Sequence, residues 1–236
     1  MGRTISLNNA DYCQGCLEIT LIWTEAAVAR QTLRKKIMKI LHIDSSPLGT
    51  NSVSRVVTAQ IVDQLKAGNK DATVIVRDVA AQPINHLTGE MLFAAADQDL
   101  SAELKAELAL TDTLIEEFLD ADVLVVGAPM YNFSIPSQLK TWIDRISKAG
   151  RTFRYSEKGP EGLATKTRVI IASSRGGVYS QGPAAAMDHQ EAYLKAVFGF
   201  LGVSSVEVIR AEGVAFARDK ALADAGEEAK KIALAA

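Results

Sequence analysis

The chain has 236 residues, of which 48% are hydrophobic, 23% charged and 6% aromatic. This composition is typical of a folded globular protein and excludes a disordered or collagen-like one. Its 26 basic and 28 acidic residues give a formal net charge of −2, which disfavours a strongly basic nucleic-acid-binding protein. The sequence contains no apolar run of the roughly 20 residues that a bilayer-spanning helix needs, so we expect neither nucleic acid nor membrane as a partner.

Residues 1–37 differ in pattern from the rest of the chain. Their most apolar stretch, residues 17–23, is interrupted by Glu18, whereas a secretory signal peptide needs an unbroken apolar segment. Cys13 and Cys16 are the only cysteines, and one CxxC without further cysteines or histidines nearby does not make a zinc site. We interpret residues 1–37 as an N-terminal extension that is poorly ordered or lies upstream of the true start at Met38. Any role of the two cysteines stays open.

From Met38 onward, short apolar segments alternate with longer amphipathic ones. Strands are predicted over residues 39–44, 73–78, 122–128, 167–173 and 206–211. Helices are predicted over residues 52–66, 101–119, 137–148, 187–201 and 220–236, because apolar side chains recur there at helical spacing or because helix-forming residues dominate. Residues 149–166 form a loop or short hairpin inserted before the fourth strand.

Five strands that alternate with five helices predict an α/β fold with a parallel sheet covered on both faces. The common five-stranded arrangement is the flavodoxin-like one, a three-layer α/β/α sandwich with strand order 2-1-3-4-5. We expect residues 38–236 to form this single domain. The order places a ligand crevice at the carboxyl ends of strands 1 and 3, so the loops after strands 1, 3 and 4 should together form the site.

The loop after the first strand, residues 45–54 (SSPLGTNSVS), is called here the hydroxyl loop. It leads into a helix, and the N–H groups and dipole of a helix N-terminus favour a bound anion. The loop lacks the patterns GxGxxG and GxxxxGK[ST], which excludes a dinucleotide fingerprint and a Walker loop. We therefore expect a monophosphate held by hydroxyl and amide groups, although Ser52 could simply cap the helix.

The loops after the third and fourth strands complete the predicted site. The aromatic loop, residues 128–136 (APMYNFSIP), holds two large aromatic side chains that are costly to expose, and these can form the wall of a flat apolar ligand or pack under a neighbouring loop. The glycine loop, residues 173–179 (SSRGGVY), has paired glycines that allow close backbone approach to a ligand or form a plain turn. Phosphate and ring chemistry in one place predicts FMN as the cofactor.

Three sequence stretches resemble one known family. Met130-Tyr131-Asn132-Phe133, Ser174-Arg175-Gly176-Gly177 and the segment 153–163 (FRYSEKGPEGL) are similar to those of the FMN-dependent NADH-azoreductases, also called NADH:quinone oxidoreductases. The resemblance covers Met38 to the C-terminus. It implies that residues Ser46, Ser52, Val53 and Ser54 hold the phosphate and ribityl chain, and that residues 130–133 and 174–177 contact the isoalloxazine ring.

The resemblance also implies a homodimer with one FMN per subunit, and reduction of quinones and aromatic azo compounds at the expense of NADH. The expected mechanism is ping-pong two-electron transfer through the flavin, so no side chain is assigned as catalytic acid or base. Phe153, Tyr155 and Tyr179 are candidates for the substrate pocket, with residues 149–166 projecting toward a partner's flavin or forming a plain surface loop. A cytoplasmic location fits a domain without cysteines.

Two other functions stay open at this point. A flavodoxin-type carrier would bind FMN and pass single electrons to a protein. Such carriers are strongly acidic and compact, whereas residues 38–236 hold 21 basic and 25 acidic residues, a net charge of −4, and carry a long insertion. A flavodoxin-like interaction module would bind no cofactor. The sequence does not identify the physiological acceptor or distinguish NADH from NADPH as donor.

Overall fold

The computed structural model of the protein describes residues 37–94 and 99–234, with side chains up to Lys231. Apart from Ile37, the predicted N-terminal extension lies outside the described residues, as do Cys13 and Cys16. By its internal contacts, Met38–Ala236 forms a unit of its own, and the description below concerns this unit.

The sheet has five parallel strands in the order β2-β1-β3-β6-β7. The strands are β1 (Lys39–Asp44), β2 (Thr73–Asp78), β3 (Val123–Pro129), β6 (Arg168–Ser174) and β7 (Ser205–Ala211). Counting only these five, the order is 2-1-3-4-5, as the sequence predicted. Pro129 lies opposite Ser174 in the register of β3 and β6. The aromatic and glycine loops therefore begin side by side at the same edge of the sheet.

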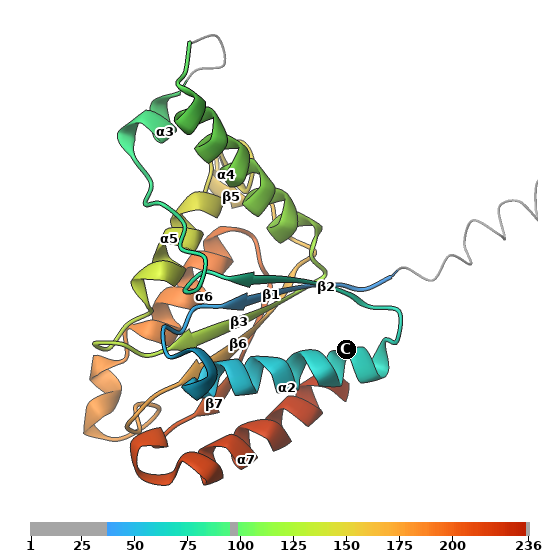
Figure 1. Ribbon diagram of the computed structural model, residues 1–236, viewed down its shortest axis with the longest axis vertical. Helices are drawn as coiled ribbons and strands as arrows, with labels where there is room; N and C mark the ends of the chain where they lie inside the picture. The colour runs from blue at the N-terminus through green and yellow to red at the C-terminus, as the bar shows by residue number, and fades with distance from the viewer. Residues whose placement is uncertain (1–36, 95–98, 235–236) are drawn as a thin grey trace, which may run out of the picture. The chain divides into compact units, whose positions relative to one another are not determined.

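Alternate residues of β3 face two separate core clusters. Val123 and Val125 pack with the helices α2 (Val53–Gly68) and α7 (Val214–Leu234). Leu124 and Val126 pack against α4 (Ala102–Asp120), α5 (Ser137–Ile146) and α6 (Gln190–Phe200). Figure 1 shows α2 and α7 side by side along one face of the sheet. All seven residues of β3 are buried, as expected for a central strand covered on both faces.

The helices depart from the prediction mainly at their starts. Helix α7 begins at Val214 rather than at Lys220. It has an additional first turn, which is separated from the regular part of the helix by a residue with non-helical backbone angles, Ala217 (φ −147°). Helix α6 begins at Gln190, three residues later than predicted, because Pro183–Met187 forms a separate 3-10 turn, η2. The short elements α3 (Gly89–Phe93) and η1 (Gly49–Asn51) were not predicted.

The insertion at residues 149–166 is a two-stranded hairpin, β4 (Phe153–Ser156) with β5 (Gly159–Gly162), one of the two forms predicted. Its end packs backbone to backbone on the residues after α6. A Cβ atom at Gly162 would lie 2.0 Å from the nitrogen of Gly202, so only glycine fits at this position. The Ala164 N–H donates to the Leu201 carbonyl over 2.8 Å, which fastens the hairpin to this part of the fold.

Within the described part of the chain, no helix has the length and apolar character needed to cross a bilayer. The same residues contain no group of three or more histidine, cysteine, aspartate or glutamate side chains placed to hold a metal ion.

Candidate functional site

Direct contacts join the three loops at the carboxyl edge of the sheet. The Ser45 hydroxyl donates to the carbonyl of Gly127, just before the aromatic loop, over 2.6 Å. The Met130 N–H of the aromatic loop donates to the Ser174 carbonyl of the glycine loop over 2.8 Å. The structure therefore brings the hydroxyl, aromatic and glycine loops together, as the sequence predicted.

The hydroxyl loop presents small polar groups at the start of α2. Ser46, Ser52 and Ser54 are each about 1% exposed, and the Ser52 and Ser54 hydroxyls lie 3.0 Å apart. Ser52 caps α2 by accepting a hydrogen bond from the Arg55 N–H. One hydroxyl hydrogen of the serine pair serves their mutual bond, which leaves the other free to donate.

Two backbone donors lie beside these hydroxyls. Among the described residues, the N–H groups of Val53 and Ser54 have no hydrogen-bond acceptor, because the first N–H groups of a helix have no partner within it. Free N–H groups, a serine hydroxyl and the positive end of the α2 dipole are suited to a bound phosphate.

An arginine below the hydroxyl loop holds its backbone in place. Arg55 makes two hydrogen bonds to the Asp78 carboxylate, of 2.5 and 2.8 Å, and donates to the Ser46 carbonyl over 2.9 Å. The hydrogen bond from Arg55 is the main cause that lowers the pKa of Asp78, against the opposing effect of burial. The guanidinium is thus engaged with Asp78 and with the loop carbonyl.

The aromatic loop makes a tight turn at Tyr131–Ser134. Tyr131 and Ser134 exchange two backbone hydrogen bonds of 2.9 and 3.0 Å, and the two residues between them have positive φ, 48° at Asn132 and 70° at Phe133. Asparagine tolerates this left-handed conformation, whereas phenylalanine adopts it at a cost. Among the described residues, the Asn132 and Phe133 N–H groups have no acceptor, so the turn presents two free donors.

The glycine loop has its carbonyl groups bonded to the start of α7, while the amides of its two glycines stay free. The carbonyls of Arg175, Gly176 and Gly177 accept hydrogen bonds of 3.0 to 3.2 Å from backbone N–H groups of residues 213–215, at the start of α7. The Gly176 and Gly177 N–H groups find no acceptor within the described residues. The loop therefore presents an unpaired pair of backbone donors.

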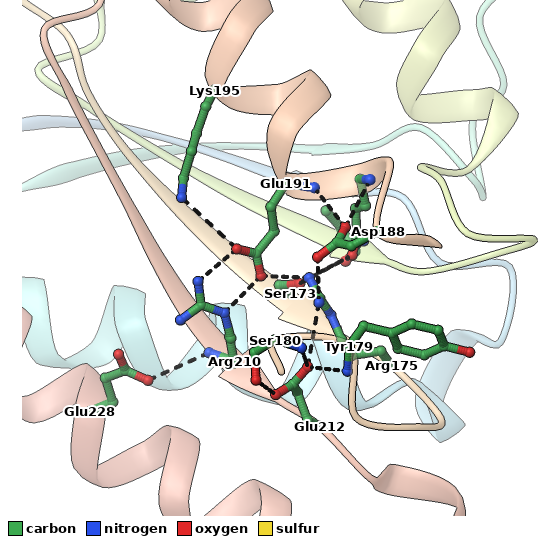
Figure 2. A network of polar contacts seen from close by, with 12 residues as sticks. Ser173, Arg175, Tyr179, Ser180, Asp188, Glu191, Lys195, Arg210, Glu212 and Glu228 are labelled. Atoms are coloured by element: carbon green, nitrogen blue, oxygen red, sulfur yellow. Dashed lines mark hydrogen bonds and ion pairs between the residues drawn. The ribbon is translucent and has the colours of Figure 1, made fainter. Parts of the chain in front are cut away.

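Arg175 belongs to the glycine loop, but its side chain points into the protein (Figure 2) and is fully buried. Its guanidinium forms ion pairs with Asp188 at 2.7 Å, with Glu191, and with Glu212 at 3.4 Å. Glu191 also binds Arg210 through both carboxylate oxygens, at 2.8 and 2.7 Å. Arg175 is one of the residues predicted to contact the ring. Its side chain is engaged with carboxylates, so only its backbone is available at this position.

One of these carboxylates, that of Glu212, also fixes the C-terminal end of the glycine loop. Glu212 accepts hydrogen bonds from the Tyr179 and Ser180 N–H groups, at 2.8 and 2.9 Å, and from the Ser180 hydroxyl. Burial raises the pKa of Glu212, but these hydrogen bonds and the charge of Arg175 outweigh it, so that the net pKa is lowered. The residues after Gly177 are thereby tied to the β7–α7 connection.

A cavity of about 600 Å³ opens beside the aromatic loop. It is lined by Pro47 of the hydroxyl loop, residues 131, 132 and 134–136 of the aromatic loop, the start of α5 and Tyr193 of α6. Burial, together with the charge of Asp144, raises the pKa of Tyr193 to about 12, so its hydroxyl keeps its proton at neutral pH. No residue of the glycine loop is part of this lining.

The three candidates for the substrate pocket lie in two places. The Tyr179 ring lies 6.2 Å from that of Phe133, edge to face, and so joins the aromatic and glycine loops. Phe153 is 9% exposed and packs on Phe200 at 4.7 Å, while Tyr155 is 74% exposed on the hairpin. In the described chain, no recorded contact brings Phe153 or Tyr155 to the three loops.

The residues whose side chains anchor the glycine loop through buried polar contacts were not predicted from the sequence. They are Asp188, Gln190, Glu191, Arg210 and Glu212. Charged residues around a helix start and after an edge strand usually lie in solvent, so their types alone gave no warning. The polar run 188–191 (DHQE) directly before a predicted helix was the available signal.

The groups present fit a flat ligand with one phosphate. The hydroxyl loop supplies the free N–H groups of residues 53 and 54 and the buried serines 46, 52 and 54. The other two loops supply the free N–H groups of residues 132, 133, 176 and 177 and the Phe133 and Tyr179 rings. The buried Tyr131 hydroxyl has no partner in the described chain, which leaves a further polar group for a ligand. The arrangement therefore agrees with the predicted chemistry of FMN.

Comparison with known proteins places this geometry in context. A family model described as a flavodoxin-like fold matches residues 38–233. Proteins named FMN-dependent NADH:quinone oxidoreductase are similar in sequence. That of Azospirillum brasilense is 58% identical over 204 residues, which cover 84% of this chain and 98% of that protein. That of Sinorhizobium fredii is 56% identical over 197 residues, covering 83% and 96%.

Solved structures show the same fold. An FMN-dependent NADH-azoreductase from Bacillus anthracis, solved in complex with FMN, superposes with a TM-score of 0.77 at 28% sequence identity, covering 84% of this chain and 98% of that one. A second azoreductase structure from Bacillus anthracis superposes with a TM-score of 0.76 at 30% identity, covering 84% and 99%.

Proposed function

Because the chain belongs to the flavodoxin-like family of FMN-dependent NADH:quinone oxidoreductases, we propose that it binds FMN and transfers two electrons from NADH to quinones, and that it also cleaves aromatic azo bonds by reduction. The observation that carries the proposal is the set of free backbone N–H groups on three adjoining loops. Such donors are suited to a phosphate at one end and to a polar heterocycle at the other.

Each loop has its own part in holding the cofactor. Ser46, Ser52, Val53 and Ser54 would bind the phosphate and ribityl chain, with the α2 dipole favouring the negative charge. Residues 130–133 and 174–177 would contact the ring, the latter through backbone rather than through the engaged Arg175 side chain. When bound, FMN supplies two-electron chemistry, and the protein positions it.

The protein's own contribution to the reaction is electrostatic. The free N–H groups of Asn132 and Gly177 would stabilise the negative charge of a reduced ring bound between their loops. Their backbone is fixed by the turn hydrogen bonds and by the contacts of residues 213–215, so little reorganisation accompanies the charge. We assign no side chain as acid or base, because the bound flavin would itself supply the two-electron chemistry.

Further parts of the proposal concern assembly and location. We propose a homodimer, in which the β4–β5 hairpin with its exposed Tyr155 reaches toward the partner's site. We also propose that residues 38–236 form the three-layer FMN-binding domain and that the protein is cytoplasmic, which agrees with the absence of cysteine from this segment.

An anaerobic titration tests the proposed function. Purified protein loaded with FMN is mixed with NADH, then with a quinone, and the yellow flavin absorbance is followed. We expect rapid bleaching by one equivalent of NADH per flavin and full return with the quinone. Slow bleaching by NADH but fast electron exchange with a reductase would instead identify a carrier, and a protein whose spectrum is unchanged by added FMN would overturn the proposal.

A further inference from the structure

Four consecutive residues at the start of α6, Asp188–Glu191, contact both loops that are proposed to hold the flavin ring. None of them belongs to either loop. Asp188 precedes the helix, and its carboxylate accepts hydrogen bonds from the Gln190 and Glu191 N–H groups, at 3.0 and 3.2 Å. The segment is therefore rigidly attached to α6, which packs in the core through Leu194 and Phe198.

Gln190 bridges the ends of the two central strands. Its side-chain Nε2 donates to the Ala128 carbonyl at the end of β3 over 2.6 Å. Its Oε1 accepts from the Ser173 hydroxyl at the end of β6, over 3.2 Å, and from the Arg175 guanidinium over 3.1 Å. The residue is fully buried, so each of these bonds lies in a low-dielectric setting where an unmade bond is costly.

The neighbours of Gln190 extend this bridge to the loops themselves. The His189 N–H donates to the Phe133 carbonyl over 3.0 Å, at the residue of the aromatic turn with the larger positive φ. Asp188 binds the Arg175 guanidinium at 2.7 Å, as Figure 2 shows. One segment thus holds the strained turn on one side and the glycine loop on the other.

We propose that Gln190 is a positioning residue for the flavin ring, which sets the separation and orientation of the aromatic and glycine loops without touching the cofactor. The inference rests on the proposed function, because it concerns the same ring site. It follows from the topology: β3 and β6 are neighbours in register, and Gln190 is a single buried side chain that bonds to both of their ends. The phosphate subsite lies on β1 and α2, outside this bridge, so Gln190 acts on ring binding alone.

The test compares two flavins and three variants of the full chain. Gln190→Met removes all three side-chain bonds at similar volume. Gln190→Glu keeps an acceptor for Ser173 and Arg175 but loses the donor to the Ala128 carbonyl. The matched control is Thr167→Val. Thr167 is 2% exposed and bonds the Ala121 carbonyl over 3.1 Å at the opposite edge of the sheet. Dissociation constants of FMN and of riboflavin, the visible spectrum of the bound flavin and the melting temperature of the flavin-free protein are measured.

We expect Gln190→Met to raise the dissociation constants of FMN and of riboflavin about tenfold each, so that the ratio of the two constants stays as in the wild type. The fine structure of the bound-flavin spectrum should also change. Gln190→Glu should change both constants in the same direction while the flavin-free protein still folds. Thr167→Val should lower the melting temperature but leave both constants and the spectrum unchanged.

Wild-type constants and spectrum in both Gln190 variants would overturn the inference, whatever their melting temperatures. A selective loss of FMN over riboflavin would also overturn it, because the effect would then lie at the phosphate. These results differ from failure of the proposed function, in which the wild-type protein itself would bind no flavin.

Discussion

The hydroxyl loop and the glycine loop present the same chemical feature, free backbone N–H groups at the carboxyl edge of the sheet, but they are built differently. In the hydroxyl loop the free donors are the first N–H groups of α2, and Ser52, which caps the helix, is their neighbour in sequence. In the glycine loop the donors belong to irregular backbone, whose conformation is fixed by the bonds of residues 213–215 to the loop carbonyls and by the ion pairs of the buried Arg175.

The difference lies in how far apart the cooperating residues are in sequence. The serines and donors of the hydroxyl loop lie within ten residues of one another, and their distant supports are few, chiefly the Arg55–Asp78 pair and the bond from Ser45 to the Gly127 carbonyl. The glycine loop depends on carboxylates from α6 and from the β7–α7 connection. A local site tolerates changes elsewhere in the chain, whereas a site held by distant charges fails when any one of them is removed.

The largest effect is expected from Arg175→Met. This substitution leaves Asp188, Glu191 and Glu212 close together without their shared cation, and removing one partner of a buried ion pair costs about 3–5 kcal/mol. We expect the free energy of unfolding of the flavin-free protein to fall by that amount in urea denaturation, and FMN binding to be lost or severely weakened.

Arg154→Met is the control for this change, because Arg154 pairs with Glu161 on the exposed face of the hairpin. Exposed ion pairs of this kind contribute little, so its unfolding midpoint should match that of the wild type. If the two arginine variants were equally stable, the Arg175 network would not be what holds the glycine loop.

The second effect concerns the aromatic turn. Asn132→Leu places a branched side chain at φ 48°, where residues other than glycine and asparagine pay about 1–2 kcal/mol, and it removes the amide. We expect weaker FMN retention, measured by fluorescence of released flavin, and slower reduction by NADH. Asn132→Gly is the matched variant, since glycine accepts the backbone angle and lacks only the amide.

Retention restored in Asn132→Gly would assign the effect to the backbone, and equal loss in both variants would assign it to the side-chain amide. Unchanged retention and reduction in Asn132→Leu would remove Asn132 from the proposed site.

These two loops also mark what the sequence could and could not predict. The sheet order and the strand bounds followed from apolar runs and from the handedness of crossovers, since Lys39–Asp44 and Thr73–Asp78 were predicted to the residue. The three loops followed from that order. The inward direction of the Arg175 side chain did not, because nothing local distinguishes an arginine that faces a ligand from one that faces three distant carboxylates.

The left-handed turn at Asn132 and Phe133 was equally hidden. Asn-Phe is not the glycine-containing pair that favours two positive φ angles, and the conformation is held by backbone bonds that include one from His189. The start of α7 was misplaced for a related reason: its first two residues, Val214 and Ala215, are fixed by their backbone bonds to the glycine loop, which no local pattern indicates. The misses therefore lie where distant contacts determine the backbone.

A smaller effect should distinguish binding of the phosphate from binding of the ring. Ser52→Ala removes the cap of α2, which costs about 1 kcal/mol, and also a proposed phosphate ligand. We expect FMN to bind several-fold more weakly while riboflavin, which has no phosphate, binds as to the wild type. Ser101→Ala is the control, since Ser101 caps α4 in the same way, through the Leu104 N–H at 3.2 Å, away from the three loops.

Both serine variants should lose similar stability in thermal unfolding, and only Ser52→Ala should change the ratio of the two dissociation constants. A change of that ratio in Ser101→Ala, or its absence in Ser52→Ala, would contradict the assignment of the hydroxyl loop to the phosphate.

The smallest effect is a pH dependence that compares the two loop anchors. Burial opposes ionisation of Asp188, but hydrogen bonds from the Glu191 N–H, Arg175 and the Gln190 N–H outweigh it and lower its pKa. For Asp78, the hydrogen bond from Arg55 is the main cause of the lowered pKa. A carboxyl whose pKa is lower in the folded state stabilises the protein fully above its unfolded-state value, about 3.9, and this contribution is lost as pH falls through the folded-state pKa.

We therefore expect the stability of the flavin-free protein to decline below about pH 4, and the decline to be shallower in Asp188→Asn and in Asp78→Asn than in the wild type. Urea unfolding midpoints across the acid range give the three curves, and flavin is omitted because its phosphate titrates in a higher range, near pH 6. A curve for Asp188→Asn parallel to that of the wild type would mean that protonating Asp188 does not release the glycine loop. A shallower curve for Asp188→Asn alone would mean that the distant anchor depends on charge and the Arg55–Asp78 support does not.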